Sequence, residues 1–284
     1  MAKDSGIEWT HHTFNPWWGC TKISPACKNC YAETWAKRVG RLLWGPKAPR
    51  RVPSETYWEQ PLAWNREANR SNERRRVFCA SMADVFEDRR DLDVHRERLW
   101  KLIAATPKLD WLLLTKRPQR VNALTPYGTN WPDNVWLGST AENQKWLDKR
   151  MGELSSTYAK ILFLSCEPLL GPLDLSRWIA EARTGGARKL DWLIAGGESG
   201  GRARPTNPEW FTSLRDQCVH AGVRFHFKQW GNWHPVGEKL PAKRKLKTMF
   251  LSSGDKIVLA NVRKKEAGRE LEGITWDEFP IPSF

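Results

Sequence analysis

The sequence has no run of about 18 consecutive apolar residues, the length at which a helix can cross a membrane. Its first residues, Met-Ala-Lys-Asp-Ser-Gly, lack the apolar core of a signal peptide. The chain also contains no low-complexity tract and no internal repeat beyond an alternation of strands and helices. We therefore expect a cytoplasmic globular protein that does not bind a membrane, with free cysteines rather than disulfides.

Acidic residues are scarce relative to basic ones: 46 Lys and Arg oppose 32 Asp and Glu, so the formal net charge is +14. Two segments carry nearly all of the excess, residues 33–76 with a net charge of +6 and residues 238–269 with +7. Such confined positive charge is typical of a surface that binds a polyanion, most often nucleic acid. The 18 tryptophans could add surfaces for base stacking, although we expect most to lie in the core.

Apolar runs of strand length recur along the chain, at Val77–Met82, Trp111–Thr115, Val135–Ser139, Ile161–Ser165, Trp192–Gly196 and Val223–Lys228. Helix-like segments lie between them, at Asp93–Ala105, Asn143–Leu154, Leu175–Ala182 and Pro208–His220, the last with Asn207 as its N-cap. Most of the runs are continuous rather than alternating, which predicts strands buried on both faces of a parallel sheet. Six or seven such units predict an α/β fold, a full or partial (β/α) barrel.

Two segments depart from this alternation. Residues 40–76 are rich in Pro, Arg and Trp, and we expect a basic insertion that is irregular or forms short helices. Residues 248–262 read as two short strands about a turn at Gly254-Asp255. The predicted domains are therefore a barrel over residues 1–230 and a basic extension over residues 231–284, with a β-hairpin packed on the barrel.

Three of the six cysteines, Cys20, Cys27 and Cys30, lie close together with the spacing C-x6-C-x2-C. Three thiolates on one loop suit three irons of a [4Fe–4S] cluster and leave the fourth iron open. A zinc site is the alternative, since the C-x2-C half fits and His11 or His12 could supply a fourth ligand. We favour the cluster because the chain has no second cysteine pair and the loop would lie at the carboxyl edge of a barrel.

Five blocks of the chain resemble a known family: NPWWGCTKISPACKNCYAE, FLSCEPLLGPLDL, WLIAGGESGGRARP, FHFKQWGNW and KKEAGRELEGITWDEFP. Over nearly the whole chain they resemble the phage Gp37/Gp68 family, a three-cysteine-motif group similar to radical S-adenosylmethionine (SAM) proteins and remotely to spore photoproduct lyase. The resemblance implies a barrel of radical SAM type, SAM at the open iron, and an electron donor such as flavodoxin or ferredoxin. The chain departs from the commoner C-x3-C-x2-C spacing, and its Gly-Gly-Glu follows a later strand than is usual.

Polar residues at the ends of the predicted strands are the candidates for contacting the cofactor and the substrate. The candidates for SAM binding are Ser81, Asp84, Lys116, Asn143, Gly197, Glu198, Ser199 and Arg202, and those for catalysis are Cys166, Glu167 and Glu198. Lys116, Arg117 and Arg202 would pair with a carboxylate or a phosphate, and Gly196–Gly201 would let the backbone approach the cofactor. An ordinary loop or cap role is the alternative for each of them.

The candidate substrate follows from the basic segments. Phosphate contacts are expected from Arg74, Arg75, Arg76, Lys243, Arg244, Lys245, Lys247, Lys264, Lys265 and Arg269. Six to ten such contacts would reduce the affinity for nucleic acid by roughly three to five decades between low and moderate salt. By analogy with the lyase, the activity would be repair or modification of a base. Two other classes remain: a zinc-stabilised nucleic-acid-binding protein without activity, and a radical SAM enzyme acting on a protein or a small molecule.

Overall fold

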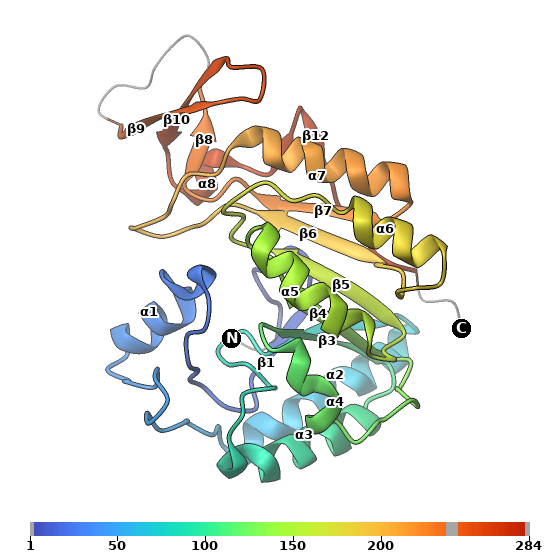
Figure 1. Cartoon of the computed structure of the whole chain (residues 1–284). Helices are drawn as coiled ribbons and strands as arrows, with labels where there is room; N and C mark the ends of the chain where they lie inside the picture. Colours follow the sequence, from blue (N-terminus) through green and yellow to red (C-terminus); the bar gives the residue numbers. More distant parts are fainter. Residues whose placement is uncertain (1–2, 237–243, 282–284) are drawn as a thin grey trace. The chain divides into compact units, whose positions relative to one another are not determined.

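A computed structural model describes residues 3–236 and 244–281 of the chain (Figure 1). Its main sheet has seven strands in sequential order: β1 His12–Phe14, β2 Arg75–Cys79, β3 Leu109–Thr115, β4 Val135–Thr140, β5 Ile161–Cys166, β6 Trp192–Gly196 and β7 Arg224–Gln229. The pairs β1–β2, β2–β3, β3–β4 and β6–β7 are parallel. Parallel neighbours need crossover connections, which here contain helices, so the predicted partial (β/α) barrel is confirmed.

Each of the six predicted apolar runs overlaps a strand, and each predicted helix is present. The helices of the chain are α1 Tyr31–Arg38, α2 Glu55–Ser71, α3 Asp93–Ala104, α4 Val121–Leu124, α5 Gln144–Ser155, α6 Ser176–Arg183, α7 Pro208–Ala221 and α8 Lys264–Ala267. Asn207 caps α7 as expected, because its side chain accepts a hydrogen bond from the Glu209 amide at 3.1 Å. No helix among the described residues has both the length and the apolar character that crossing a membrane requires.

The expectation that residues 40–76 are irregular or form short helices is wrong for their second half. This part forms α2, a helix of 17 residues that contains Pro61. A proline inside a helix usually ends it, since it lacks an amide hydrogen and its ring crowds the preceding turn. Here Trp58, Pro61, Trp64 and Ala68 form one buried face at helical spacing, and α2 packs with this face against β2 and β3. The packing outweighs the local effect of the proline.

The chain divides into two compact units, which are described separately. Among the described residues, unit 1 comprises 3–139 and 150–163, and unit 2 comprises 140–149 and 164–281. Aromatic rings fill the core of unit 1, where Phe14 makes edge-to-face contacts with Trp58 and Trp111 at 5.1 and 5.5 Å between ring centroids. Eleven of the 18 tryptophans in the two units are buried, which confirms that most serve the core.

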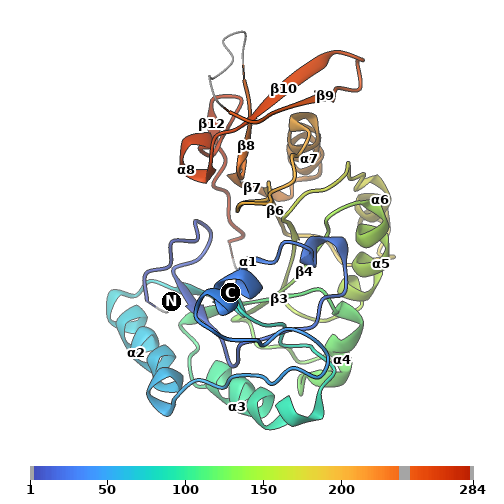
Figure 2. The same ribbon diagram turned by 90° about the vertical axis from the view of Figure 1, so that its left-hand side faces the viewer.

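The predicted C-terminal hairpin is confirmed in unit 2. Strands β9 Leu246–Phe250 and β10 Lys256–Asn261 pair in antiparallel fashion, and β8 Trp233–Pro235 pairs with the other edge of β10 (Figure 2). Gly254 has a φ of +89° in the connecting turn, a conformation that glycine adopts without strain. The hairpin is fastened to the start of α7, where the Asn207 side-chain amide donates to the Phe250 carbonyl at 2.9 Å. The remaining short strands are β11 Glu270–Leu271 and β12 Ile274–Thr275.

Candidate functional site

The cysteine loop of unit 1 follows β1 and is fixed at its start by backbone contacts. The amide of Gly19 donates to the Met82 carbonyl at 3.0 Å, and the carbonyl of Cys20 accepts from the Gly45 amide at 3.0 Å. Gly19 has a φ of +112°, and a Cβ added there would lie 2.5 Å from the Leu43 carbonyl oxygen. A side chain at this position would therefore displace the loop that carries Cys20.

The three cysteines occupy three different kinds of backbone. Cys20 lies in an extended segment that bridges to Trp44, Cys27 ends the 3₁₀ turn Pro25–Cys27, and Cys30 immediately precedes α1. All three are partly exposed, whereas Cys79, Cys166 and Cys218 are buried, and all six thiols are free. Exposure thus separates the clustered cysteines from the scattered ones.

Positive groups lie next to two of the clustered thiols. Burial raises the pKa of the Cys20 thiol to about 12, a shift that Asp84 increases and Arg117 opposes. Burial also raises the pKa of Cys30, and the Glu33 amide at the start of α1 and the Lys116 ammonium group act against this shift. A helix N-terminus and nearby cations stabilise a thiolate, which is the form that binds a metal.

A buried ion pair connects the end of β3 with Cys20. The Asp84 carboxylate accepts hydrogen bonds from Arg117 Nη1 at 2.8 Å, from the Thr115 hydroxyl at 2.7 Å and from the backbone amides of Lys116 and Phe86 at 3.1 and 3.0 Å. Arg117 Nη1 also lies 3.7 Å from Cys20 Sγ. Asp84, a predicted SAM contact, therefore already holds four donors and positions Arg117.

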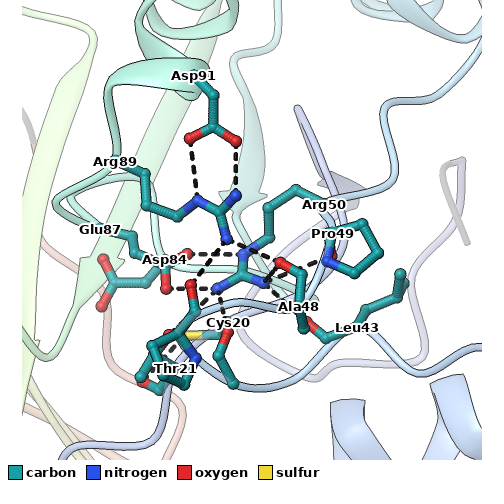
Figure 3. Close-up of polar contacts among 12 residues, drawn as sticks. Cys20, Thr21, Leu43, Ala48, Pro49, Arg50, Asp84, Glu87, Arg89 and Asp91 are labelled. Carbon is teal, nitrogen blue, oxygen red and sulfur yellow. Dashed lines mark hydrogen bonds and ion pairs between the residues drawn. The ribbon is translucent and has the colours of Figure 1, made fainter.

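A second buried ion pair holds the loop around Arg50, a residue that the sequence analysis did not single out (Figure 3). Arg50 Nε and Nη2 donate to the two carboxylate oxygens of Glu87 at 2.9 and 2.7 Å, and the two side chains are 1% and 4% exposed. The same guanidinium donates to the carbonyls of Leu43 and Ala48 at 3.0 and 2.8 Å, and to the Thr21 hydroxyl at 3.2 Å. Arg50 thereby ties the residue next to Cys20 to the segment after β2.

Ser81, another predicted SAM contact, lies just after β2. Its hydroxyl accepts a hydrogen bond from the Asn15 side-chain amide at 3.1 Å, and its carbonyl accepts one from the Tyr31 hydroxyl at 2.6 Å. These bonds join the ends of β1 and β2 to the first residue of α1. Unit 1 thus brings Ser81, Asp84 and Lys116 to the same end of its strands as the cysteine loop.

The two histidines considered as zinc ligands are engaged elsewhere. His11 Nδ1 accepts from the Arg76 amide at 2.8 Å, and His12 stacks on Trp64 with 4.5 Å between ring centroids. Burial and the charge of Arg76 lower the pKa of His11 to about 4. Within the described ranges, no three His, Cys, Asp or Glu side chains converge as the ligands of a single metal ion would. The three clustered cysteines nevertheless supply the ligand type that a [4Fe–4S] cluster requires, free and partly exposed thiols on one loop.

In unit 2, the predicted residues Glu167 and Glu198 each form an ion pair. Glu167 follows β5, and its Oε1 lies 3.0 Å from Lys228 Nζ on β7. A Cβ added at Gly196 on β6 would lie 2.8 Å from the same oxygen, so this glycine leaves room for the carboxylate. Glu198 accepts from Arg204 at 2.8 and 2.6 Å, which closes the loop that follows β6.

The other predicted residues of unit 2 have internal contacts or lie on the surface. The Asn143 side chain accepts from the Trp146 amide at 3.3 Å at the start of α5. Gly197 allows a close approach between two segments of the chain's own backbone, since a Cβ there would lie 1.9 Å from the Trp230 carbonyl oxygen. Cys166 is fully buried, and burial raises its pKa well above the usual value. Ser199 is partly exposed and Arg202 is exposed.

The predicted phosphate contacts divide into paired and exposed side chains. In unit 1, Arg74 donates to Asp110 at 2.6 Å, Arg75 to Glu73 at 2.7 Å, and Arg76 to the Trp9 carbonyl at 3.2 Å. In unit 2, Arg244 pairs with Glu266 at 2.9 Å and Arg269 with Asp277. Lys264 is partly exposed, whereas Lys245, Lys247 and Lys265 are exposed. Lys243 lies outside the described residues.

A comparison with known families finds that the model for a protein of unknown function (DUF5131) matches residues 4–280. No curated protein matches the chain. The matching model does not name the phage Gp37/Gp68 family, so the resemblance to that family stays a prediction.

Solved structures of spore photoproduct lyase are similar to the chain. One is complexed with dinucleoside spore photoproduct, with 16% sequence identity and a TM-score of 0.48. Another is a mutant with bound AdoMet and dinucleoside spore photoproduct, with 16% identity and a TM-score of 0.46. Each match covers 94% of this chain and 72% of the other.

Proposed function

We propose that this chain, which belongs to the DUF5131 family, holds a [4Fe–4S] cluster through Cys20, Cys27 and Cys30 and acts as a radical SAM enzyme on nucleic acid. The observation that carries the proposal is the contrast between three partly exposed thiols on one loop and three buried thiols elsewhere. Burial raises the pKa of the Cys20 and Cys30 thiols, and the cationic groups beside them oppose this shift, which is the direction of the thiolate form that iron binds. A bound cluster would supply one electron to cleave SAM, which is chemistry that the cofactor performs once the protein has positioned it.

Residues of unit 1 would bind SAM beside the cysteine loop. The Lys116 ammonium lies near Cys30 and would pair with the SAM carboxylate. The Ser81 hydroxyl would contact the amino group or the ribose, and Asp84 would act through Arg117. In unit 2, Glu167 stays a candidate for contacting the substrate, because it lies at a strand end, where it pairs with Lys228.

Nucleic acid is supported as the substrate by exposed aromatic and basic side chains next to the cysteine loop. Tyr31, Trp35 and Val39 follow one another at intervals of four residues and are 57%, 42% and 45% exposed. Arg38 and Arg41 lie beside them and are exposed. Bases stack on exposed aromatic rings while cations contact the backbone, a combination typical of single-strand binding.

Anaerobic reconstitution with iron and sulfide tests the proposal. The wild type should become brown and bind about four irons per chain, and with SAM and dithionite it should form 5′-deoxyadenosine. Cys27→Ala should abolish product formation, whereas Cys218→Ala, which removes a buried thiol, should retain it. Colourless protein with one zinc would support the non-enzymatic alternative, and an intact cluster that leaves SAM uncleaved would contradict the radical SAM assignment.

The salt dependence of oligonucleotide binding tests the substrate. If the three exposed lysines of unit 2 contact phosphate, the slope of log K against log salt should include about −2 to −3 from them. Replacing Lys245 and Lys247 together by Gln should reduce the slope by about 1 to 2. An affinity that does not respond to salt would contradict a nucleic-acid substrate and would favour a protein or a small molecule.

A further inference from the structure

The Arg117 guanidinium donates a hydrogen bond to the sulfur of one of the clustered cysteines, Cys20. It follows β3 directly, 97 residues after Cys20 in the sequence, and its side chain is 8% exposed. Nη1 lies 3.7 Å from Cys20 Sγ, and Nη2 donates to the Thr21 carbonyl at 2.7 Å. The guanidinium therefore contacts both the thiol and the backbone that carries it.

The orientation of this guanidinium is fixed by Asp84. The carboxylate sits 2.8 Å from Nη1 and is itself held by the Thr115 hydroxyl and by the amides of Lys116 and Phe86. Burial lowers the pKa of Arg117, but Asp84 and the Cys20 sulfur raise it more, so the group keeps its charge. A charge held in this way, away from water, is screened little by salt.

We propose that Arg117 is a positioning residue of the cluster site, which donates a hydrogen bond to the Cys20 thiolate and makes the cluster easier to reduce. The inference rests on the proposed function. Reduction adds one negative charge to the cluster, and a nearby positive charge stabilises the reduced form more than the oxidised form. Hydrogen bonds to ligand sulfurs shift cluster potentials in the same direction.

The other two cysteines have contacts of their own. The Ser24 hydroxyl lies 3.8 Å from Cys27 Sγ, and Cys30 immediately precedes α1, whose Ala32 and Glu33 amides donate to its sulfur. Loss of Arg117 should therefore act on one ligand and should not disturb the helix start at Cys30. Substitution then changes the potential without removing a ligand.

The test is a redox titration of reconstituted protein, followed by electron paramagnetic resonance, with iron content measured in parallel. Arg117→Gln should bind the same number of irons and lower the midpoint potential by at least ~59 mV, which is a tenfold change in the one-electron equilibrium. Arg117→Lys keeps the charge but not the fork of donors, so it should give a smaller decrease. Lys28→Gln removes an exposed positive charge between Cys27 and Cys30 and should leave the potential nearly unchanged.

A second measurement covers the case in which Arg117→Gln does not fold. The iron–thiolate stretching frequencies of Arg117→Lys, measured by resonance Raman spectroscopy, should differ from those of the wild type, because the hydrogen bond to Cys20 is altered. Variants with wild-type potentials and frequencies would overturn the inference and leave the proposed function intact. A wild type that takes up no cluster would overturn both.

Discussion

The Arg50–Glu87 pair allows a sharp test of what holds the cysteine loop in place. Both side chains are almost completely buried, and Glu87 accepts two hydrogen bonds from Arg50. Removing one partner of a buried pair leaves the other charge without compensation in a poorly solvated site, which typically costs about 3–5 kcal/mol. Glu87→Gln keeps the shape and one acceptor, so we expect a loss of ~3 kcal/mol, and Glu87→Ala should lie at the upper end of the same range.

The assay is urea denaturation followed by circular dichroism, with iron retention after reconstitution as the functional readout. Arg50 also donates to the Thr21 hydroxyl at 3.2 Å, so release of Arg50 should loosen the backbone next to Cys20 and reduce iron retention. The matched control is Glu55→Gln, which breaks an equally close but exposed bidentate pair with Arg98 and should leave stability nearly unchanged. If Glu87→Gln is no more destabilising than this control, the pair does not hold the loop.

Three further predictions concern other parts of the chain. Gly196→Ala should lower the free energy of unfolding by ~1–3 kcal/mol, because the added methyl group would crowd Glu167. Gly201→Ala should leave it unchanged, since a Cβ there meets nothing within 4 Å. Trp35→Ala should weaken single-stranded oligonucleotide binding about fivefold through ~1 kcal/mol of lost stacking, and Trp35→Phe should retain most of the affinity. Between pH 6.5 and about 4 the unfolded chain binds a proton that folded His11 does not, so stability should fall as the pH is lowered. His11→Asn should remove this part of the decrease, ~1–2 kcal/mol after allowing for partial exposure of the ring.

The sheet could be predicted from the sequence because its signal is local. Strands such as β5 and β6 are continuous apolar runs bounded by polar residues, and a strand buried on both faces needs little else to be recognised. The hairpin could be predicted for the same reason, since Gly254 marks a turn between two short strand-like runs. Local rules failed for α2, where the composition indicated irregular structure or short helices but tertiary packing of Trp58 and Trp64 maintains a long helix.

The candidate site could be predicted only in part, because most of its contacts join residues that are far apart in the sequence. The spacing of Cys20, Cys27 and Cys30 is a local feature, and the partial exposure of all three agrees with a shared role. The contacts between Arg117 and Cys20 and between Arg50 and Glu87 join residues 97 and 37 positions apart. No local pattern pairs one arginine with one carboxylate among so many, so these contacts required the structure.

Burial rather than charge decides what an arginine of this chain does. A guanidinium offers five donors in a planar fork, so it can join several backbone segments when buried or hold a phosphate when exposed. Arg74 and Arg76 were expected to bind phosphate, yet they donate to Asp110 and to the Trp9 carbonyl inside unit 1. Arg50 has no distinguishing pattern in the sequence, yet it holds the cysteine loop through the Leu43 carbonyl and the Thr21 hydroxyl. The net charge of a segment therefore overstates the number of its cations that are exposed and unpaired with a carboxylate, and the exposed side chains have to be counted from the structure.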